Sequence, residues 1–140
     1  MDAIHAAGGI LLAWYRRVFK KVDSFVGRFS VSILLKGVVD GFEWVCLGVY
    51  GPSNDSARNA MWVELDSGRL QWSSAWCLIG DFNIIRYPVE RLGCNSFSSA
   101  MFKFSYFIEK HNLVDLPLEG GDYTWFHDFV NPSMSRIDRL

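Results

Sequence analysis

The stretch Trp76-Cys77-Leu78-Ile79-Gly80-Asp81-Phe82-Asn83 decides how this chain of 140 residues is interpreted. The largely apolar run 75–79 predicts a buried strand, and the glycine after it predicts the end of that strand. Asp81 and Asn83 lie two residues apart, so an extended backbone would point both side chains to the same side. A carboxylate and a carboxamide at a strand end can present polar chemistry at the edge of a sheet. Gly, Asp and Asn also form ordinary turns, so these residues alone leave a structural turn as the alternative.

Length and composition indicate one globular domain with a sheet-rich core. A chain of 140 residues, half hydrophobic and 16% aromatic, is long enough to bury a core and is not of disordered composition. The net charge of -1 excludes a strongly basic nucleic-acid module, so any contact with DNA must come from local patches. The three cysteines show no metal-ligand spacing, and we expect Cys46 and Cys77 to be buried, unreactive thiols.

The chain carries no visible targeting signal. The apolar run 9–14 is too short to span a bilayer, and no basic stretch precedes it as in a signal peptide. We therefore expect no membrane association and a place in the nucleus or cytoplasm.

Apolar periodicity predicts an α+β domain. Two helices are expected, one capped by Ser53 or Asn54 and fading near 67–68, the other running from Ser96 to about Asn112. The second helix should pack Phe97, Met101, Phe104 and Ile108 against a sheet. The expected strands cover 9–14, 18–26, 29–35, 42–50, 75–79 and 114–116, with 123–125 β-prone.

Five short motifs in a fixed order carry a resemblance to a known family. They are Gly48-Val49-Tyr50-Gly51-Pro52, Gly80-Asp81-Phe82-Asn83, Glu90-Arg91-Leu92-Gly93, Asp122-Tyr123-Thr124-Trp125 and Ser135-Arg136-Ile137-Asp138-Arg139. Together they resemble the endonuclease/exonuclease/phosphatase family, whose fold is that of deoxyribonuclease I. The closest likeness is to the endonuclease domain of plant LINE-type non-LTR retrotransposons. The resemblance implies a partial four-layer α/β/β/α sandwich, with residues 1–140 forming a single partial domain that lacks N-terminal and C-terminal strands.

The resemblance implies a reaction and roles for the motif residues. The family reaction is Mg²⁺-assisted hydrolysis of a DNA phosphodiester, and the parent elements carry a reverse transcriptase domain as partner. Asp81 would position or deprotonate the attacking water and supply a weak, incomplete metal ligand. Asn83 would hydrogen-bond near the same water, and Tyr50 would reach the scissile phosphate. Tyr50 also fits a core aromatic at a strand end.

The later motifs imply further site residues. Asp138 would orient a catalytic histidine, although a surface salt bridge is the plainer interpretation. Tyr123, Trp125 and Arg136 would line the DNA-facing surface, with a core role as the alternative for the aromatic pair. A local salt bridge between Glu90 and Arg91 is expected within their loop. The basic cluster Arg16, Arg17, Lys20 and Lys21 fits a solvated hairpin end or a phosphate contact.

Several family residues have no counterpart. The metal-binding glutamate is expected before the Gly-Gly-Ile-Leu stretch, yet residues 1–7 contain no glutamate, and the first asparagine and final Ser-Asp-His are also absent. We therefore expect a fragment that is inactive as it stands, binds Mg²⁺ weakly and folds poorly alone because sheet edges stay unpaired. The alternatives are a non-catalytic remnant and a weak nucleic-acid-binding module. A sugar- or lipid-phosphate phosphatase is disfavoured by the Glu-Arg-Leu-Gly and Tyr-Thr-Trp blocks.

Overall fold

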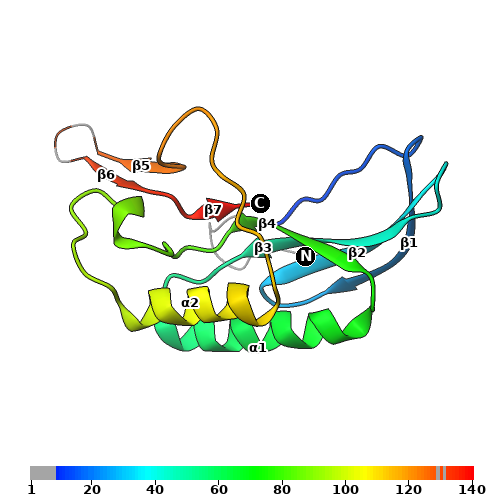
Figure 1. The fold of residues 1–140 in the computed structure, drawn as a ribbon, viewed down its shortest axis with the longest axis horizontal. Coiled ribbons are helices and arrows are strands. Elements are labelled where there is room, and N and C mark those ends of the chain that lie inside the picture. Colours follow the sequence, from blue (N-terminus) through cyan, green and yellow to red (C-terminus); the bar gives the residue numbers. More distant parts are fainter. Residues whose placement is uncertain (1–8, 129, 131) are drawn as a thin grey trace.

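A five-stranded mixed sheet, with two helices packed on one of its faces, organises the computed structural model, which describes residues 9–128, 130 and 132–140 (Figure 1). The sheet has the order β1-β2-β3-β4-β7, and β5 and β6 form a separate two-stranded sheet. The strands are β1 (Phe19–Val26), β2 (Ser30–Gly37), β3 (Glu43–Tyr50), β4 (Ala75–Asp81), β5 (Trp125–His127), β6 (Ser133–Ser135) and β7 (Asp138–Arg139). The helices are α1 (Asp55–Gln71), α2 (Ser99–Lys110) and the short 3-10 helix η1 (Pro88–Glu90). The predicted α+β class is confirmed.

The pairing of neighbouring strands changes from antiparallel to parallel at β3. Strands β1, β2 and β3 pair antiparallel, whereas β3 and β4 are parallel and are joined through α1. A parallel pair needs such a crossover, because the chain must return to the end of the sheet where β3 begins before β4 can run in the same direction. The short β7 then pairs antiparallel with the end of β4, opposite Gly80 and Asp81.

The main core lies between the sheet and the two helices. Leu47 and Leu78 face each other on neighbouring strands, and both are buried beneath the helices. The ring of Trp62 on α1 stacks over Phe104 on α2 at a centroid distance of 5.5 Å. The other members of this cluster include Val45, Val49, Met61, Leu65, Phe82, Phe107 and Ile108. Burial of such side chains supplies most of the stability, at about 1.5–3 kcal/mol each.

The first helix is longer than predicted. Asn54 caps it by accepting a hydrogen bond from the backbone N–H of Ala57 at 2.8 Å, as expected. The helix does not fade at 67–68 but continues through Gly68 to Gln71. Its last turn is held by Arg69, which donates to the carbonyl of Trp72 at 3.1 Å and lies over the ring of Trp76. Tertiary contacts thus override the weak helix propensity of glycine.

The second helix starts later than predicted, and its expected buried face is partly wrong. Ser98 is the cap, accepting from the backbone N–H of Met101 at 3.3 Å, so the helix begins at Ser99 rather than near Ser96. Phe97 therefore precedes the helix, is 53% exposed and stacks on Phe102 at 5.4 Å. Met101, Phe104 and Ile108 are buried as predicted. The helix ends at Lys110, and Asn112 adopts the left-handed conformation (φ 51°) typical of a helix stop.

Two predicted strands are not strands. Residues 9–14 form irregular chain, and Ile10 and Leu12 lie against Gly48 on the sheet face away from the helices. A Cβ on Gly48 would come within 2.7 Å of Ile10, so glycine permits this close approach. Residues 114–116 are also irregular. Short apolar runs can cover a sheet as well as join one, which explains both errors. No described helix is long and apolar enough to cross a membrane.

The packing predicts that Phe104→Ala destabilises the protein by about 3–5 kcal/mol, because the side chain is 1% exposed and its loss leaves a cavity among aromatic rings. Urea unfolding measures the loss. Phe102→Ala, on the same helix but 63% exposed, is the matched control and should change stability by less than about 0.5 kcal/mol. Equal effects of the two substitutions would contradict the assigned helix face.

Candidate functional site

Three of the predicted site residues lie at one level across three neighbouring strands. Tyr50 on β3 is directly opposite Asp81 on β4, and Asp81 is directly opposite Asp138 on β7. Residues directly opposite in a sheet point to the same face. Because Leu78 faces the helices and Asp81 is three residues further along, this face is the one away from the helices. The predicted proximity of Tyr50 and Asp81 is confirmed, and their roles stay predictions.

Asn83 joins Asp81 by a different geometry from the one predicted. Its backbone has φ 51°, so the chain is not extended and strand alternation does not orient the two side chains. Instead the backbone N–H of Asn83 donates to Asp81 Oδ1 at 2.7 Å, and Asn83 Nδ2 donates to the carbonyl of Gly51 at 2.7 Å. The turn and the site are therefore one structure, since the hydrogen bond that closes the turn also holds the Asp81 carboxylate.

Gly51 is the residue that lets this turn approach β3. A Cβ at position 51 would lie 2.2 Å from the carbonyl oxygen of Phe82, a distance that no side chain tolerates. The backbone N–H of Gly51 also donates to the carbonyl of Asp81 at 2.6 Å. The Gly-Pro turn after β3 is thus locked to the turn after β4, with Tyr50 and Asp81 at its two entrances.

The environment of Asp81 favours its protonated form. Burial raises the pKa of the Asp81 carboxyl, the hydrogen bond from the Asn83 backbone lowers it, and the negative charge of Asp138 raises it further, with a net increase. A carboxylate with a raised pKa accepts a proton from water more readily at neutral pH than an ordinary one does. Such a group in a polar corner of a sheet suits general-base chemistry.

The oxygen donors here fit Mg²⁺ in kind but not in number. Asp81 and Asp138 supply hard carboxylate oxygens, which Mg²⁺ prefers. Within 9–128, 130 and 132–140, no three or more His, Cys, Asp or Glu side chains gather closely enough to form a metal site. Mg²⁺ gives up its water shell reluctantly and is usually held by one or two carboxylates together with phosphates of the substrate. These residues therefore offer a weak site.

The predicted DNA-facing aromatic residues Tyr123 and Trp125 differ in their exposure. Trp125 is 42% exposed and stacks on His127, with ring centroids 5.8 Å apart. Tyr123 is half-buried beside Thr124, whose Oγ1 accepts from the backbone N–H groups of Ile137 and Asp138. The 123–125 segment is thereby tied to the chain entering β7. Tyr123 and Trp125 are therefore linked to the site through the hydrogen bonds of Thr124, which lies between them in the sequence.

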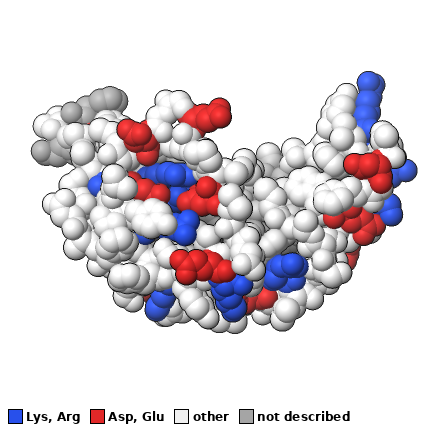
Figure 2. Space-filling model, viewed as in Figure 1, with Lys and Arg blue, Asp and Glu red and all other residues white. Residues whose placement is uncertain are grey.

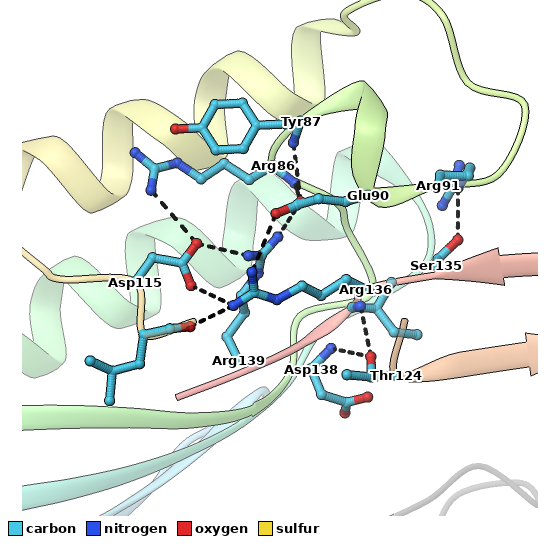
Figure 3. Close-up of polar contacts among 12 residues, drawn as sticks. Arg86, Tyr87, Glu90, Arg91, Asp115, Thr124, Ser135, Arg136, Asp138 and Arg139 are labelled. Carbon is cyan, nitrogen blue, oxygen red and sulfur yellow. Dashed lines mark hydrogen bonds and ion pairs between the residues drawn. The ribbon is translucent and has the colours of Figure 1, made fainter. Parts of the chain in front are cut away.

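Arg136 is engaged within the protein. Its Nη2 donates to Asp115 Oδ1 at 3.2 Å and to the carbonyl of Leu116 at 2.6 Å, and its Nη1 lies 3.8 Å from Glu90 Oε1 (Figure 3). A guanidinium held by these partners has little freedom to reach a ligand. The predicted substrate contact stays a prediction, and the structure gives Arg136 a clear internal role.

Arg136 belongs to a buried charge network that the sequence did not predict (Figure 3). Arg139 pairs with Glu90 and, at 2.7 Å, with Asp115, and both Arg139 and Glu90 are less than 9% exposed. Arg86 lies 3.7 Å from Asp115, so three guanidinium groups face two carboxylates. The backbone N–H groups of Arg86 and Tyr87 also donate to Glu90. The network joins the 86–90 loop, the 115–116 segment and β7.

The expected local pair between Glu90 and Arg91 is wrong. Glu90 turns inward to Arg139, 49 residues away, while Arg91 Nε donates to Ser135 Oγ at 3.0 Å. Burial alone would raise the pKa of Glu90, but the hydrogen bond and charge of Arg139 outweigh it and lower that pKa. The positions of Glu90 and Arg91 next to each other in the sequence did not indicate their distant partners, Arg139 and Ser135.

The fold corresponds to part of the deoxyribonuclease I-like fold of endonucleases. A solved structure that shares it is the endonuclease domain of TRAS1, a telomere-specific non-LTR retrotransposon, with a TM-score of 0.60 and 12% sequence identity. The match covers 77% of this chain and 48% of that chain, so this chain spans about half the length of that structure. At this identity the likeness concerns the fold alone. No protein-family model and no curated protein matches the sequence.

The charge network predicts that Glu90→Gln destabilises the protein at pH 7 by about 3–5 kcal/mol, because it leaves Arg139 buried without its countercharge. Urea unfolding measures the change. Glu43→Gln, which removes the exposed pair with Lys36, is the control and should cost about 0–1 kcal/mol. Because the Glu90 pKa is lowered by folding, its contribution is complete above the unfolded value of about 4.3 and is lost as pH falls through the folded value. The variant should lack this acid-side loss.

In contrast to Glu90→Gln, Asp81→Asn is expected to increase the stability of the protein at pH 7. Folding raises the pKa of Asp81, so the ionised carboxylate costs stability, and this cost appears as pH rises through the folded value. Asparagine keeps an oxygen for the Asn83 N–H without the charge, and it should stabilise the protein at pH 7 by about 0.5–2 kcal/mol. The difference should vanish near pH 3, where both side chains are neutral. Thermal unfolding at the two pH values checks this, and a destabilised variant at pH 7 would refute it.

Proposed function

We propose that this chain is a portion of a Mg²⁺-dependent DNA endonuclease of the non-LTR retrotransposon type, and that it does not nick DNA by itself. One observation carries the proposal: Tyr50, Asp81 and Asp138 occupy one level of three adjacent strands. They do so in a fold that matches part of a retrotransposon endonuclease. The likeness in fold supports this assignment, and the polar corner supports phosphodiester chemistry.

The residues suit hydrolysis of a phosphodiester by water. The Asp81 carboxylate would accept a proton from the attacking water, aided by its raised pKa. The Tyr50 hydroxyl, directly across the strand pair, would donate to a phosphate oxygen. A bound Mg²⁺ would neutralise charge on the phosphate and the leaving oxygen. The product is a DNA strand with a free 3′-hydroxyl, which suits a reverse transcriptase as the partner in a parent element.

The substrate contact rests on local charge. On the face seen in Figure 2, basic and acidic side chains are interspersed, and the surface is hollowed between the β5–β6 end and the β1–β2 end. The basic cluster Arg16, Arg17, Lys20 and Lys21 is exposed near the start of β1. DNA would be held by such patches, because a net charge of -1 supplies no general attraction to phosphate. A nuclear or cytoplasmic place fits this substrate.

Low activity follows from the incomplete set of groups. The carboxylates of Asp81 and Asp138 would bind Mg²⁺ weakly by themselves. The motif residues include neither the family's metal-binding glutamate nor its final histidine. Groups of this kind contribute about 10²–10⁴-fold each to a reaction of this type. We therefore expect these 140 residues by themselves to keep the arrangement of the site but to hydrolyse DNA very slowly.

A plasmid-nicking assay tests the proposal. Purified chain, incubated with supercoiled plasmid and Mg²⁺, should convert no more plasmid to the open circle than an Asp81→Ala variant does, since the metal site is incomplete. Robust nicking by the parent chain that disappears in Asp81→Ala would contradict the expected inactivity and would mean that another residue completes the site.

A separate measurement distinguishes the endonuclease portion from a nucleic-acid-binding module. Fluorescence anisotropy with a labelled duplex, repeated over a range of salt concentrations, reports phosphate contacts as a salt-dependent affinity. Binding that falls when Arg16 and Arg17 are replaced by glutamine, without any nicking, would favour the binding module.

A further inference from the structure

Arg58 on α1 bridges the two turns that carry the candidate site. Its Nη2 donates to the carbonyl of Ser53 at 2.7 Å and to the carbonyl of Asn83 at 3.0 Å. Ser53 lies in the turn after β3, and Asn83 lies in the turn after β4. One guanidinium nitrogen therefore joins the two segments that follow Tyr50 and Asp81.

The guanidinium of Arg58 is itself held in one orientation. Its Nη1 pairs with Asp55 in the first turn of α1, and the Arg58 side chain is only 12% exposed. A guanidinium presents its N–H donors in a rigid planar fork, so the ion pair on Nη1 also sets the direction in which Nη2 donates. Hydrogen bonds from a charged donor are stronger than neutral ones. Arg58 is therefore a rigid support between the two turns rather than a solvated surface charge.

The contact of Arg58 with Asn83 continues to Asp81 through the backbone. Asn83 has φ 51°, a left-handed conformation that persists where surrounding contacts determine it. Arg58 holds the carbonyl of Asn83, while the N–H of the same residue donates to Asp81 Oδ1 at 2.7 Å. The Asn83 side chain is tied to the carbonyl of Gly51. The support from α1 thus meets the one turn whose N–H holds the Asp81 carboxylate.

The charge of Arg58 is not what acts on Asp81. The described titratable neighbours of Asp81 along the sheet are Asp138 on β7 and Tyr50 on β3. Burial raises the pKa of Asp81, the hydrogen bond from Asn83 lowers it, and the charge of Asp138 raises it further. Arg58 is not among these causes, so its influence on Asp81 passes through the position of the Asn83 backbone.

We propose that Arg58 is a positioning residue for Asp81, because its hydrogen bond to the Asn83 carbonyl keeps the Asn83 N–H on the Asp81 carboxylate. Through this contact Arg58 fixes the orientation of the carboxyl group that would act as the general base. The importance of this role for hydrolysis rests on the proposed function. The effect on Asp81 itself is measured without a nuclease assay, so either statement can fail while the other holds.

Arg69 offers a matched control on the same helix. It lies near the other end of α1 and also donates to two backbone carbonyls, those of Trp72 at 3.1 Å and Ser74 at 3.4 Å. Neither carbonyl belongs to the turns around Asp81. Arg58→Met and Arg69→Met each remove a guanidinium and its two carbonyl contacts while keeping an unbranched side chain that suits a helix. Only the first of these variants loses a contact with the site.

Hydrogen exchange at the Asn83 amide gives the direct readout. This N–H is bonded to Asp81 Oδ1 and should be protected in the parent chain. In Arg58→Met it should exchange at least about tenfold faster, because the turn opens more often without its support. In Arg69→Met it should exchange as in the parent. Amides of β2 and β3 report global unfolding in the same NMR experiment, which separates a general loss of stability from local opening of the turn.

The titration of Asp81 gives a second readout, which a general loss of stability would not move. Because the hydrogen bond from Asn83 lowers the pKa of Asp81, the loss of that bond in Arg58→Met should raise the midpoint of the titration. The expected rise is about 0.5–1 pH unit, the equivalent of one hydrogen bond. Carbon-13 NMR of the Asp81 carboxyl measures the midpoint, which should keep its parent value in Arg69→Met.

Three results would overturn the inference. They are Asn83 exchange that is equal in Arg58→Met and the parent, an Asp81 midpoint that stays or falls, and equal changes in Arg58→Met and its control. Should Arg58→Met fail to fold, Arg58→Gln takes its place and should give the same two changes, since glutamine stays polar but is too short to reach either carbonyl. Plasmid nicking by any of these chains bears on the proposed function alone.

Discussion

The buried ion pairs of Arg139 are the interactions on which the candidate site most depends. β7 is two residues long, and a ladder that short holds a strand weakly. Arg139 anchors it by pairing with Glu90 and Asp115, which come from two separate loops. Together with the hydrogen bonds of Thr124 to the Ile137 and Asp138 backbone, these pairs keep Asp138 beside Asp81. The network thus helps to position the carboxylate of Asp138, although it makes no contact with that carboxylate.

Burial raises the pKa of both Glu90 and half-buried Asp81, but their partners move the net pKa values in opposite directions. Glu90 meets Arg139 and two backbone N–H groups, so its charged form is favoured and its pKa falls. Asp81 meets one backbone N–H and the negative charge of Asp138, so its charged form is disfavoured and its pKa rises. The first arrangement stabilises the fold. The second costs stability, which is the expected signature of a group retained for its chemistry.

The sheet is completed unevenly along β4. The end at Gly80 and Asp81 is covered by β7 and carries the polar residues, whereas the run 75–79 leaves backbone groups and an apolar groove open. The part of β4 that pairs with β7 is thus the part that carries the candidate site.

Sequence patterns predicted much of the fold because local rules governed those elements. The alternation in 29–35, the apolar run 42–50 and the cap at Asn54 each reflect one strand or one helix end, and the structure confirms them. The Gly80-Asp81-Phe82-Asn83 motif also located the polar corner. Where local signals competed, the predictions failed. Phe97 lies just outside a helix cap, and the apolar run 9–14 covers a sheet instead of joining it.

The tertiary structure alone decided the charge network and the geometry of the site. Glu90, Asp115 and Arg139 are up to 49 residues apart, and charged residues in sequence carry no mark of a distant partner. Asn83 meets Asp81 through a left-handed turn that the Gly51 contact permits, not through strand alternation. Periodicity records which face of an element is apolar. Which buried charge meets which depends on packing between elements that the chain brings together only on folding.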